Sequence, residues 1–140
     1  MADQPFKVRI QVRGYELDPQ GHVNQAVYLQ YGEHARWELL KAAGFTQDRL
    51  ISHGVGPVLL KTTIRYQREL RADDEVDVSC AFEWGEGKIF QLVQGFRLPD
   101  DTPVAKLEGV VGLLDLETRR LVHDPRGRLK ALATSPEVLG

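Results

Sequence analysis

The sequence predicts an α+β domain in which one long helix packs against an antiparallel sheet. Three observations support this fold class: one proline-free helical segment of about twenty residues at 24–44, five segments of alternating apolar and polar residues, and the order strand, helix, four strands. With 140 residues, the chain has the usual length of one domain with a single core. We therefore expect residues 1–140 to form a single domain.

The first predicted elements are a strand and the long helix. Apolar residues alternate with polar ones over residues 6–12, which is typical of a half-buried strand. A turn-forming stretch, Asp18–His22, follows. Asn24 is a favourable N-cap and Gly44 a favourable C-terminal stop, so the helix should lie between them.

This helix is apolar on two nearly opposite sides. One stripe consists of Tyr28, Tyr31, Ala35, Leu39 and Ala42. The second consists of Ala26, Leu29, Trp37 and Leu40, interrupted by Glu33. A 140-residue monomer can hardly bury a helix on both sides, so the pattern predicts that a second copy of the chain covers one of them.

The rest of the chain is predicted as strands. After a short helical stretch at 47–53, alternation of apolar and polar residues predicts strands at 58–66, 76–82, 90–98 and 104–114. Residues 110–114 are apolar on both sides, which indicates a strand covered on both faces.

Composition excludes several classes of function. The chain is 42% hydrophobic and 27% charged with a net charge of −2, so it lacks the basic footprint of a nucleic-acid binder. Its longest apolar runs, such as residues 58–60, are too short to cross a bilayer, and the N-terminus has no apolar signal core. We expect a cytoplasmic protein with neither a nucleic-acid nor a membrane partner.

Motif analysis excludes further chemistry. The single cysteine, Cys80, alternates with apolar neighbours and is predicted to be buried, which rules out an internal disulfide. There is no G-x-S-x-G turn and no glycine-rich phosphate loop, and the four histidines lack metal-site spacing. We expect no metal and no cofactor, and an enzyme of this sequence would work with a carboxylate and the backbone.

The stretch Asp18-Pro19-Gln20-Gly21-His22-Val23-Asn24, directly before the helix, carries the chemistry. Unpaired N–H groups at a helix start would stabilise a developing oxyanion, and one such donor is worth about 3 kcal/mol. Asp18 could attack the adjacent carbonyl carbon or activate a water to do so. Asp-Pro-x-Gly is also a common turn, so these residues alone leave a purely structural interpretation open.

This stretch, with Tyr28-Leu29, Glu33 and Ala35-Arg36 on the helix, resembles the hotdog-fold thioesterases of the 4-hydroxybenzoyl-CoA thioesterase type. It is also similar to the acyl-ACP thioesterases, which share a Gly/Gln-His-Val-Asn run here. The resemblance implies a hotdog fold, with a long central helix wrapped by an antiparallel five-stranded sheet. It also implies hydrolysis of acyl-CoA or acyl-ACP to a free acid and a thiol, by a homodimer or homotetramer whose sites lie at subunit boundaries.

By this resemblance, Asp18 matches the catalytic aspartate, and the backbone N–H of Gln25 matches the amide that polarises the thioester carbonyl. His22 matches the histidine of acyl-ACP thioesterases, whereas Gln20 stands where they have asparagine. His22 could act in orientation or acid–base catalysis, or it could be a structural loop histidine that is hydrogen-bonded to the helix start. Glu33 could be catalytic, as in another hotdog branch, or could pair with Arg36.

The expected substrate contacts are spread over the chain. Asn24 should mainly cap the helix, and Tyr28 should belong to the core more than to the substrate site. The cations expected to meet the phosphates of coenzyme A, or an acidic carrier protein, are Arg65, Arg68 and Arg71 around one strand end, Lys88, and Arg126, Arg128 and Lys130 near the C-terminus.

Two other functions are compatible with the sequence. A hotdog hydratase or dehydratase usually carries Asp-x-Asn-Pro-x-His, and here Gly21 replaces that proline and the histidine comes one place early. A non-catalytic binder of acyl thioesters would have little use for a charge such as Asp18 beside an apolar pocket. The length or aromatic nature of the acyl group, the choice between the two carriers, and whether Asp18 is nucleophile or base are left open.

Overall fold

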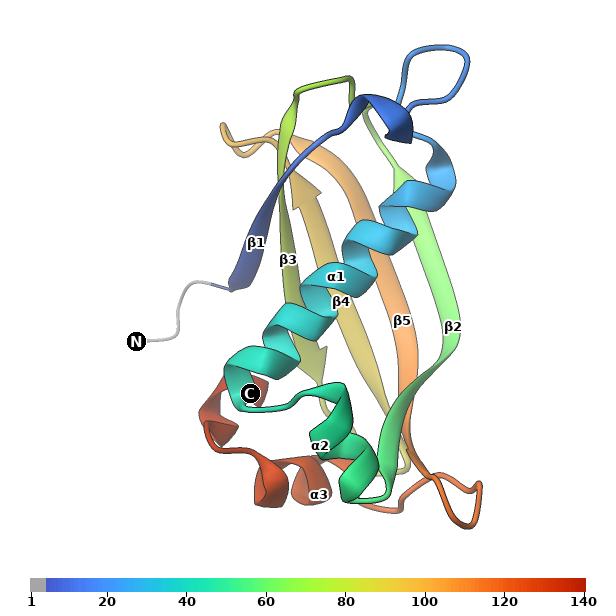
Figure 1. Ribbon diagram of the computed structural model, residues 1–140, viewed down its shortest axis with the longest axis vertical. Helices are drawn as coiled ribbons and strands as arrows, with labels where there is room; N and C mark the ends of the chain where they lie inside the picture. Colours follow the sequence, from blue (N-terminus) through green and yellow to red (C-terminus); the bar gives the residue numbers. More distant parts are fainter. Residues whose placement is uncertain (1–4) are drawn as a thin grey trace.

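The computed structural model describes residues 5–140, so the first four residues of the predicted domain lie outside it. A sheet of five antiparallel strands, in the order β1-β3-β4-β5-β2, curves around the long helix α1 (Gln25–Ala43) (Figure 1). The strands are β1 (Phe6–Gln11), β2 (Val55–Tyr66), β3 (Glu75–Glu83), β4 (Ile89–Arg97) and β5 (Pro103–Asp115). The predicted α+β architecture and its five-stranded antiparallel sheet are confirmed.

Helix α1 begins and ends where the cap residues predict. The Asn24 side chain accepts a hydrogen bond of 2.8 Å from the N–H of Ala26 at the first turn. Gly44 has φ of +104° directly after the last turn, a left-handed conformation that glycine adopts without the steric cost of a Cβ. The helix therefore has fixed ends, and its N-terminus is held beside the loop that carries Asp18.

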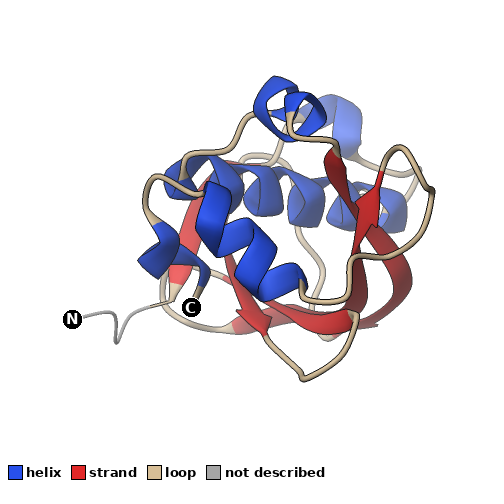
Figure 2. Cartoon of the chain, turned by 90° about the horizontal axis from the view of Figure 1, so that it is seen from below, coloured by secondary structure: helices blue, strands red, loops and turns tan. Residues whose placement is uncertain are grey.

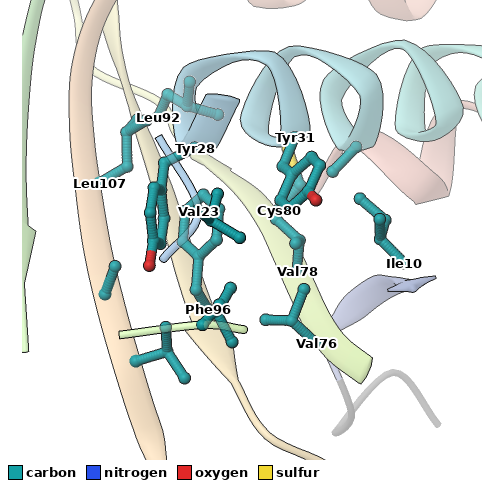
Figure 3. Close-up of a cluster of buried hydrophobic side chains, with 14 of the residues drawn as sticks. Ile10, Val23, Tyr28, Tyr31, Val76, Val78, Cys80, Leu92, Phe96 and Leu107 are labelled. Atoms are coloured by element: carbon teal, nitrogen blue, oxygen red, sulfur yellow. The ribbon is translucent and has the colours of Figure 1, made fainter. Parts of the chain in front are cut away.

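One side of α1 packs into the main core. Tyr28 and Tyr31 lie among the apolar side chains of the sheet (Figure 3). Ala42, predicted in this stripe, is exposed, and Ala43 is buried instead. The C-terminal segment covers Ala43, whose carbonyl accepts the N–H of Ser135 at 3.0 Å and whose side chain belongs to a separate cluster with Leu40.

The C-terminal segment was not predicted as helical. It forms α3 (Pro125–Leu132) and a 3-10 turn (Pro136–Leu139), which lie with α2 (Gln47–Ser52) on the same side of the sheet as α1 (Figure 2). The signal for α3 is present in the sequence, because Asp124 caps the N–H of Gly127 at 3.0 Å and a proline follows it. These short elements enclose a second core of Leu40, Ala43, Phe45, Leu50, Val55, Leu113, Leu129 and Leu139.

Strand β5 is covered on both faces near its end. It pairs with β4 and β2, and Leu113 is buried on the side of the helices. On the outer face, Leu121 packs so closely over Gly112 that a Cβ there would lie 2.7 Å from Cδ2 of the leucine. Among the helices described for residues 5–140, none combines the length and apolar character needed to cross a membrane.

Candidate active site

A narrow hairpin over residues 16–24 carries Asp18. At its base, the N–H of Asn24 donates to the carbonyl of Glu16 at 2.9 Å. Nearer its tip, the N–H of Asp18 donates to the carbonyl of His22 at 2.7 Å. These bonds place Asp18 and His22 opposite each other just before α1.

The carboxylate of Asp18 is held by one of its two oxygens. Oδ1 accepts the backbone N–H groups of Gln20 at 2.9 Å and His22 at 3.2 Å, and Gly21 makes the turn between them with φ of +81°. Within residues 5–140, Oδ2 has no hydrogen-bond partner. Asp18 is thus oriented through Oδ1 and keeps Oδ2 available for chemistry.

Asp18 lies at an open hollow of about 530 Å³ beside the start of α1. The hollow is lined by Asp18, His22, Val23, Asn24, Gln25, Tyr28, Tyr66, Gln67, Arg68 and Glu69. The structure therefore brings together six of the residues predicted from the sequence, Asp18, His22, Asn24, Gln25, Tyr28 and Arg68. The other four come from the end of β2, from the loop after it and from the hairpin.

The first turn of α1 offers the N–H of Gln25 to this hollow. The side-chain oxygen of Asn24 accepts the N–H of Ala26 at 2.8 Å, and its backbone carbonyl accepts the N–H of Val27 at 2.9 Å. Over residues 5–140, the N–H of Gln25 has no acceptor. Since the positive end of the helix dipole lies here, this N–H is suited to binding a developing negative charge.

Two tyrosines form an aromatic wall beside the free amide. The rings of Tyr28 and Tyr66 meet edge to face, with centroids 5.1 Å apart. The hydroxyl of Tyr66 donates to the carbonyl of Gln25 at 3.0 Å, which ties β2 to the first turn of the helix. Burial raises the pKa of the Tyr28 hydroxyl, so it stays neutral. The hollow is thus lined by two aromatic rings in addition to its charged and polar groups.

The loop after β2 contributes Arg68 and Arg71, two of the cations expected from the sequence, and Glu69, which the sequence did not single out as a site residue. Nε2 of His22 lies 2.6 Å from Oε2 of Glu69, and the other oxygen of Glu69 accepts two N–H groups of Arg71 at 2.6 Å and 3.0 Å. Hydrogen bonding from Arg71 lowers the pKa of Glu69, which keeps that carboxylate ionised. No local motif marks Glu69, because folding alone brings this loop to the hairpin.

Of the predicted phosphate-binding cations, Arg68 lines the hollow, and the others lie outside it in a single chain. Arg65 is exposed on β2. Lys88 follows β3, and Arg126 and Arg128 lie on or next to the first turn of α3, at the opposite end of the molecule (Figure 1). The guanidinium groups of Arg126 and Arg128 donate to the carbonyls of Gly140 and His53. Their contact with a coenzyme stays a prediction.

Glu33 lies at a second hollow, of about 310 Å³, between α1 and β2. Its lining consists of Glu33, Arg36, Trp37, Leu40, Pro57, Val58, Leu59, Phe82 and Val111. Glu33 is exposed and Arg36 is half-buried, and the part of the chain described here shows no ion pair between them. Burial lowers the pKa of Arg36. The structural role expected for Glu33 through this pair is therefore not seen.

Cys80 is buried in the main core, as predicted, and burial raises the pKa of its thiol to about 12. A thiol that remains protonated at neutral pH is a poor nucleophile. In residues 5–140, no three histidine, cysteine or acidic side chains are grouped so that they could hold a metal ion. The larger hollow brings together the side chains of Asp18, His22 and Glu69 and the N–H of Gln25.

Comparison with known proteins agrees with this geometry. Residues 12–139 match the family model of the Thioesterase-like superfamily. The chain is 31% identical to the acyl-acyl carrier protein thioesterase ATL3 of Arabidopsis thaliana over 114 residues, which cover 81% of this chain and 60% of that protein. It is 31% identical to the long-chain acyl-CoA thioesterase FadM of Escherichia coli over 116 residues, 82% of this chain and 87% of that protein.

A solved structure shows the same fold. The probable thioesterase YbaW of Escherichia coli superposes with a TM-score of 0.80 at 29% identity, over 91% of this chain and 95% of that one. The similarity therefore covers the hairpin, α1 and the sheet together rather than one motif.

Proposed function

Because the chain belongs to the Thioesterase-like superfamily, we propose that it hydrolyses an acyl thioester to a free acid and a thiol, with Asp18 as its central catalytic residue. The observation that carries this proposal is the placement of Asp18 and the free N–H of Gln25 at one hollow. An oriented carboxylate can act as nucleophile or base, and a helix-start amide can stabilise the oxyanion that forms when a carbonyl is attacked.

The proposed mechanism places the thioester carbonyl against the N–H of Gln25. As the carbon becomes tetrahedral, negative charge develops on its oxygen, and the amide stabilises that charge. Oδ2 of Asp18 either attacks the carbon directly or takes a proton from a water that does so. The bond from carbon to sulfur then breaks, and the departing sulfur receives a proton that came from water, so the product is a free thiol.

The proposed substrate is an acyl group carried by coenzyme A or by an acyl carrier protein. Both carriers occur in the names of relatives that resemble the chain equally well, ATL3 and FadM. The chain spans 60% of ATL3 and 87% of FadM. Arg68 lines the hollow together with Asp18, so it is the arginine placed to meet a negatively charged carrier there.

A thiol-release assay across carriers and acyl groups tests this function. Purified protein is mixed with acyl-CoA of increasing chain length, aromatic acyl-CoA and acyl carrier protein loaded with the same acyl groups. We expect release of free thiol from at least one of them. Crotonyl-CoA serves to detect a hydratase: loss of its double bond without thiol release would replace the thioesterase with that activity. Thermal stabilisation by acyl-CoA with no turnover of any substrate would indicate a binding protein.

We also propose that two copies pair through β2. This strand lies at the edge of the sheet and bonds only to β5 in the chain described here. Leu59 and Leu60 of this strand are 42% and 51% exposed, and Leu29 on the facing side of α1 is 43% exposed. A second copy would cover these side chains, whereas Leu40, which was predicted in the same stripe as Leu29, is already buried in the second core of the chain itself.

Solution mass tests the pairing. Light scattering of the wild type should give the mass of two or four chains, and Leu60→Asp should shift it towards one chain by placing a charge in the contact. Tyr15→Asp adds the same charge at an exposed side chain away from β2 and should leave the mass unchanged. A wild-type protein that is monomeric and fully active would contradict the proposed pairing.

A further inference from the structure

His22 lies between two carboxylates from different parts of the chain. Its backbone N–H donates to Oδ1 of Asp18 at 3.2 Å, and its ring Nε2 lies 2.6 Å from Oε2 of Glu69. Asp18 belongs to the same hairpin, whereas Glu69 comes from the loop between β2 and β3. The mechanism proposed above gives Glu69 no role, although this side chain lines the hollow.

The short contact with Glu69 determines which ring nitrogen of His22 carries a proton. A nitrogen and an ionised carboxylate oxygen attract each other at 2.6 Å only if the nitrogen bears hydrogen. A neutral imidazole has one N–H, so a proton on Nε2 leaves Nδ1 able to accept one. Within residues 5–140, Nδ1 has no hydrogen-bond partner. Of the two neutral forms of His22, the contact therefore favours the one whose Nδ1 is free to take up a proton.

Glu69 is itself held in place. Its Oε1 accepts from Nη2 and Nε of Arg71 at 2.6 Å and 3.0 Å, which leaves Oε2 facing His22. Next to it, the N–H of Val23 donates to the carbonyl of Leu70 at 2.8 Å and fastens the loop to the hairpin. The other charged side chains at this end of the hollow are Asp18 and Arg68. Glu69 is thus a fixed anion beside the imidazole.

We propose that Glu69 is a positioning residue that fixes the tautomer and orientation of His22, and that Nδ1 of His22 carries the proton that hydrolysis moves from water to sulfur. This inference rests on the proposed thioesterase function. If Asp18 acts as base, the water proton passes to Asp18, then to Nδ1 and finally to the departing thiolate. If Asp18 attacks, Nδ1 takes the proton from the water that opens the acyl–aspartyl anhydride and delivers it to the free thiolate. On either route His22 ends in its starting form.

Two variants and their combination test this role. Glu69→Gln keeps the size of the side chain and removes its charge, and we expect kcat to fall about tenfold with KM unchanged. His22→Gln should lower kcat about 100-fold. Because Glu69 acts through His22, adding Glu69→Gln to His22→Gln should cost less than a further twofold. Glu75→Gln makes the same change at an exposed position on β3 and should keep wild-type kcat.

Nitrogen NMR of labelled histidine supplies a readout that a merely structural role would not move. At a pH where the ring is neutral, His22 in the wild type should show mainly the tautomer with hydrogen on Nε2, and Glu69→Gln should reduce that preference. Wild-type kcat and an unchanged tautomer balance in Glu69→Gln would overturn the inference, as would an equal tenfold loss in the His22→Gln background. Both results would leave a thioesterase dependent on Asp18 intact, whereas a protein that releases no thiol from any substrate fails the proposed function itself.

Discussion

The hydroxyl of Tyr31 donates a hydrogen bond of 2.5 Å to Oε1 of Glu16, a buried carboxylate at the base of the hairpin that carries Asp18. The same oxygen accepts the N–H of Arg13 at 2.8 Å. Desolvation, followed by the bond to Glu16, raises the pKa of the Tyr31 hydroxyl, so it keeps its proton and donates over the whole working range. The second turn of α1 and the base of the hairpin are therefore joined directly.

Removing this hydroxyl should loosen the hairpin. Tyr31→Phe leaves the buried carboxylate of Glu16 without one donor, and we expect a loss of about 2 kcal/mol in the free energy of unfolding. Urea denaturation followed by circular dichroism measures it. Tyr15→Phe removes a hydroxyl from an exposed tyrosine and should change stability by less than about 0.5 kcal/mol. Equal stabilities of the two variants would show that the bond to Glu16 contributes nothing.

The close packing at the end of α1 leads to a second prediction. Gly44 has φ of +104°, and a Cβ there would lie 2.0 Å from Oγ1 of Thr134. Gly44→Ala should therefore cost about 2 kcal/mol through backbone strain and displacement of the C-terminal segment. Gly87→Ala is the matched control, because a Cβ at Gly87 meets nothing within 4 Å. If Gly44→Ala had as high a thermal midpoint as Gly87→Ala, a Cβ at position 44 would not cause the expected strain.

An ion pair across β1 and β3 gives the stability a defined pH dependence. Arg9 donates to both oxygens of Asp77, at 2.8 Å and 3.1 Å, and thereby lowers the pKa of that carboxyl. Since the pKa is lower in the folded state, the contribution is complete above the unfolded value of about 3.9 and is lost as pH falls through the folded value.

The corresponding variant isolates this contribution. Asp77→Asn should be less stable than the wild type by about 1 kcal/mol at pH 7, and the difference should vanish near pH 2. Urea titrations of both proteins at the two pH values measure it. A difference that is the same at both would mean that the charge of Asp77 is not what Arg9 stabilises.

Most of the fold follows from local signals, and the site follows only in part. Asn24 and Gly44 mark the ends of α1 because capping depends on neighbours in sequence. Alternation marks the five strands for the same reason, and Asp124 followed by Pro125 is a local start signal for α3. Glu69 could not be found in this way, because its relation to His22 depends on how two distant loops meet.

The second apolar side of α1 illustrates the same limit. Periodicity marks its apolar residues, but the folded chain buries Leu40 in its own second core and leaves Leu29 43% exposed. The edge that would receive a partner, β2, becomes apparent only from the strand order of the folded sheet. The periodicity of the sequence therefore identifies apolar residues on a helix face, and the strand order of the folded sheet indicates where a second copy could cover those left exposed.

The central claim, that Asp18 performs the chemistry, is tested most directly by the turnover of Asp18→Asn on the best acyl thioester substrate. Asparagine retains the shape of the side chain and can still accept the N–H groups of Gln20 and His22, so the hairpin should keep its form. We predict that kcat falls at least about 100-fold while the thermal midpoint and the solution mass match those of Asp48→Asn, an exposed control on α2. A folded Asp18→Asn protein with the kcat of the wild type would contradict the account.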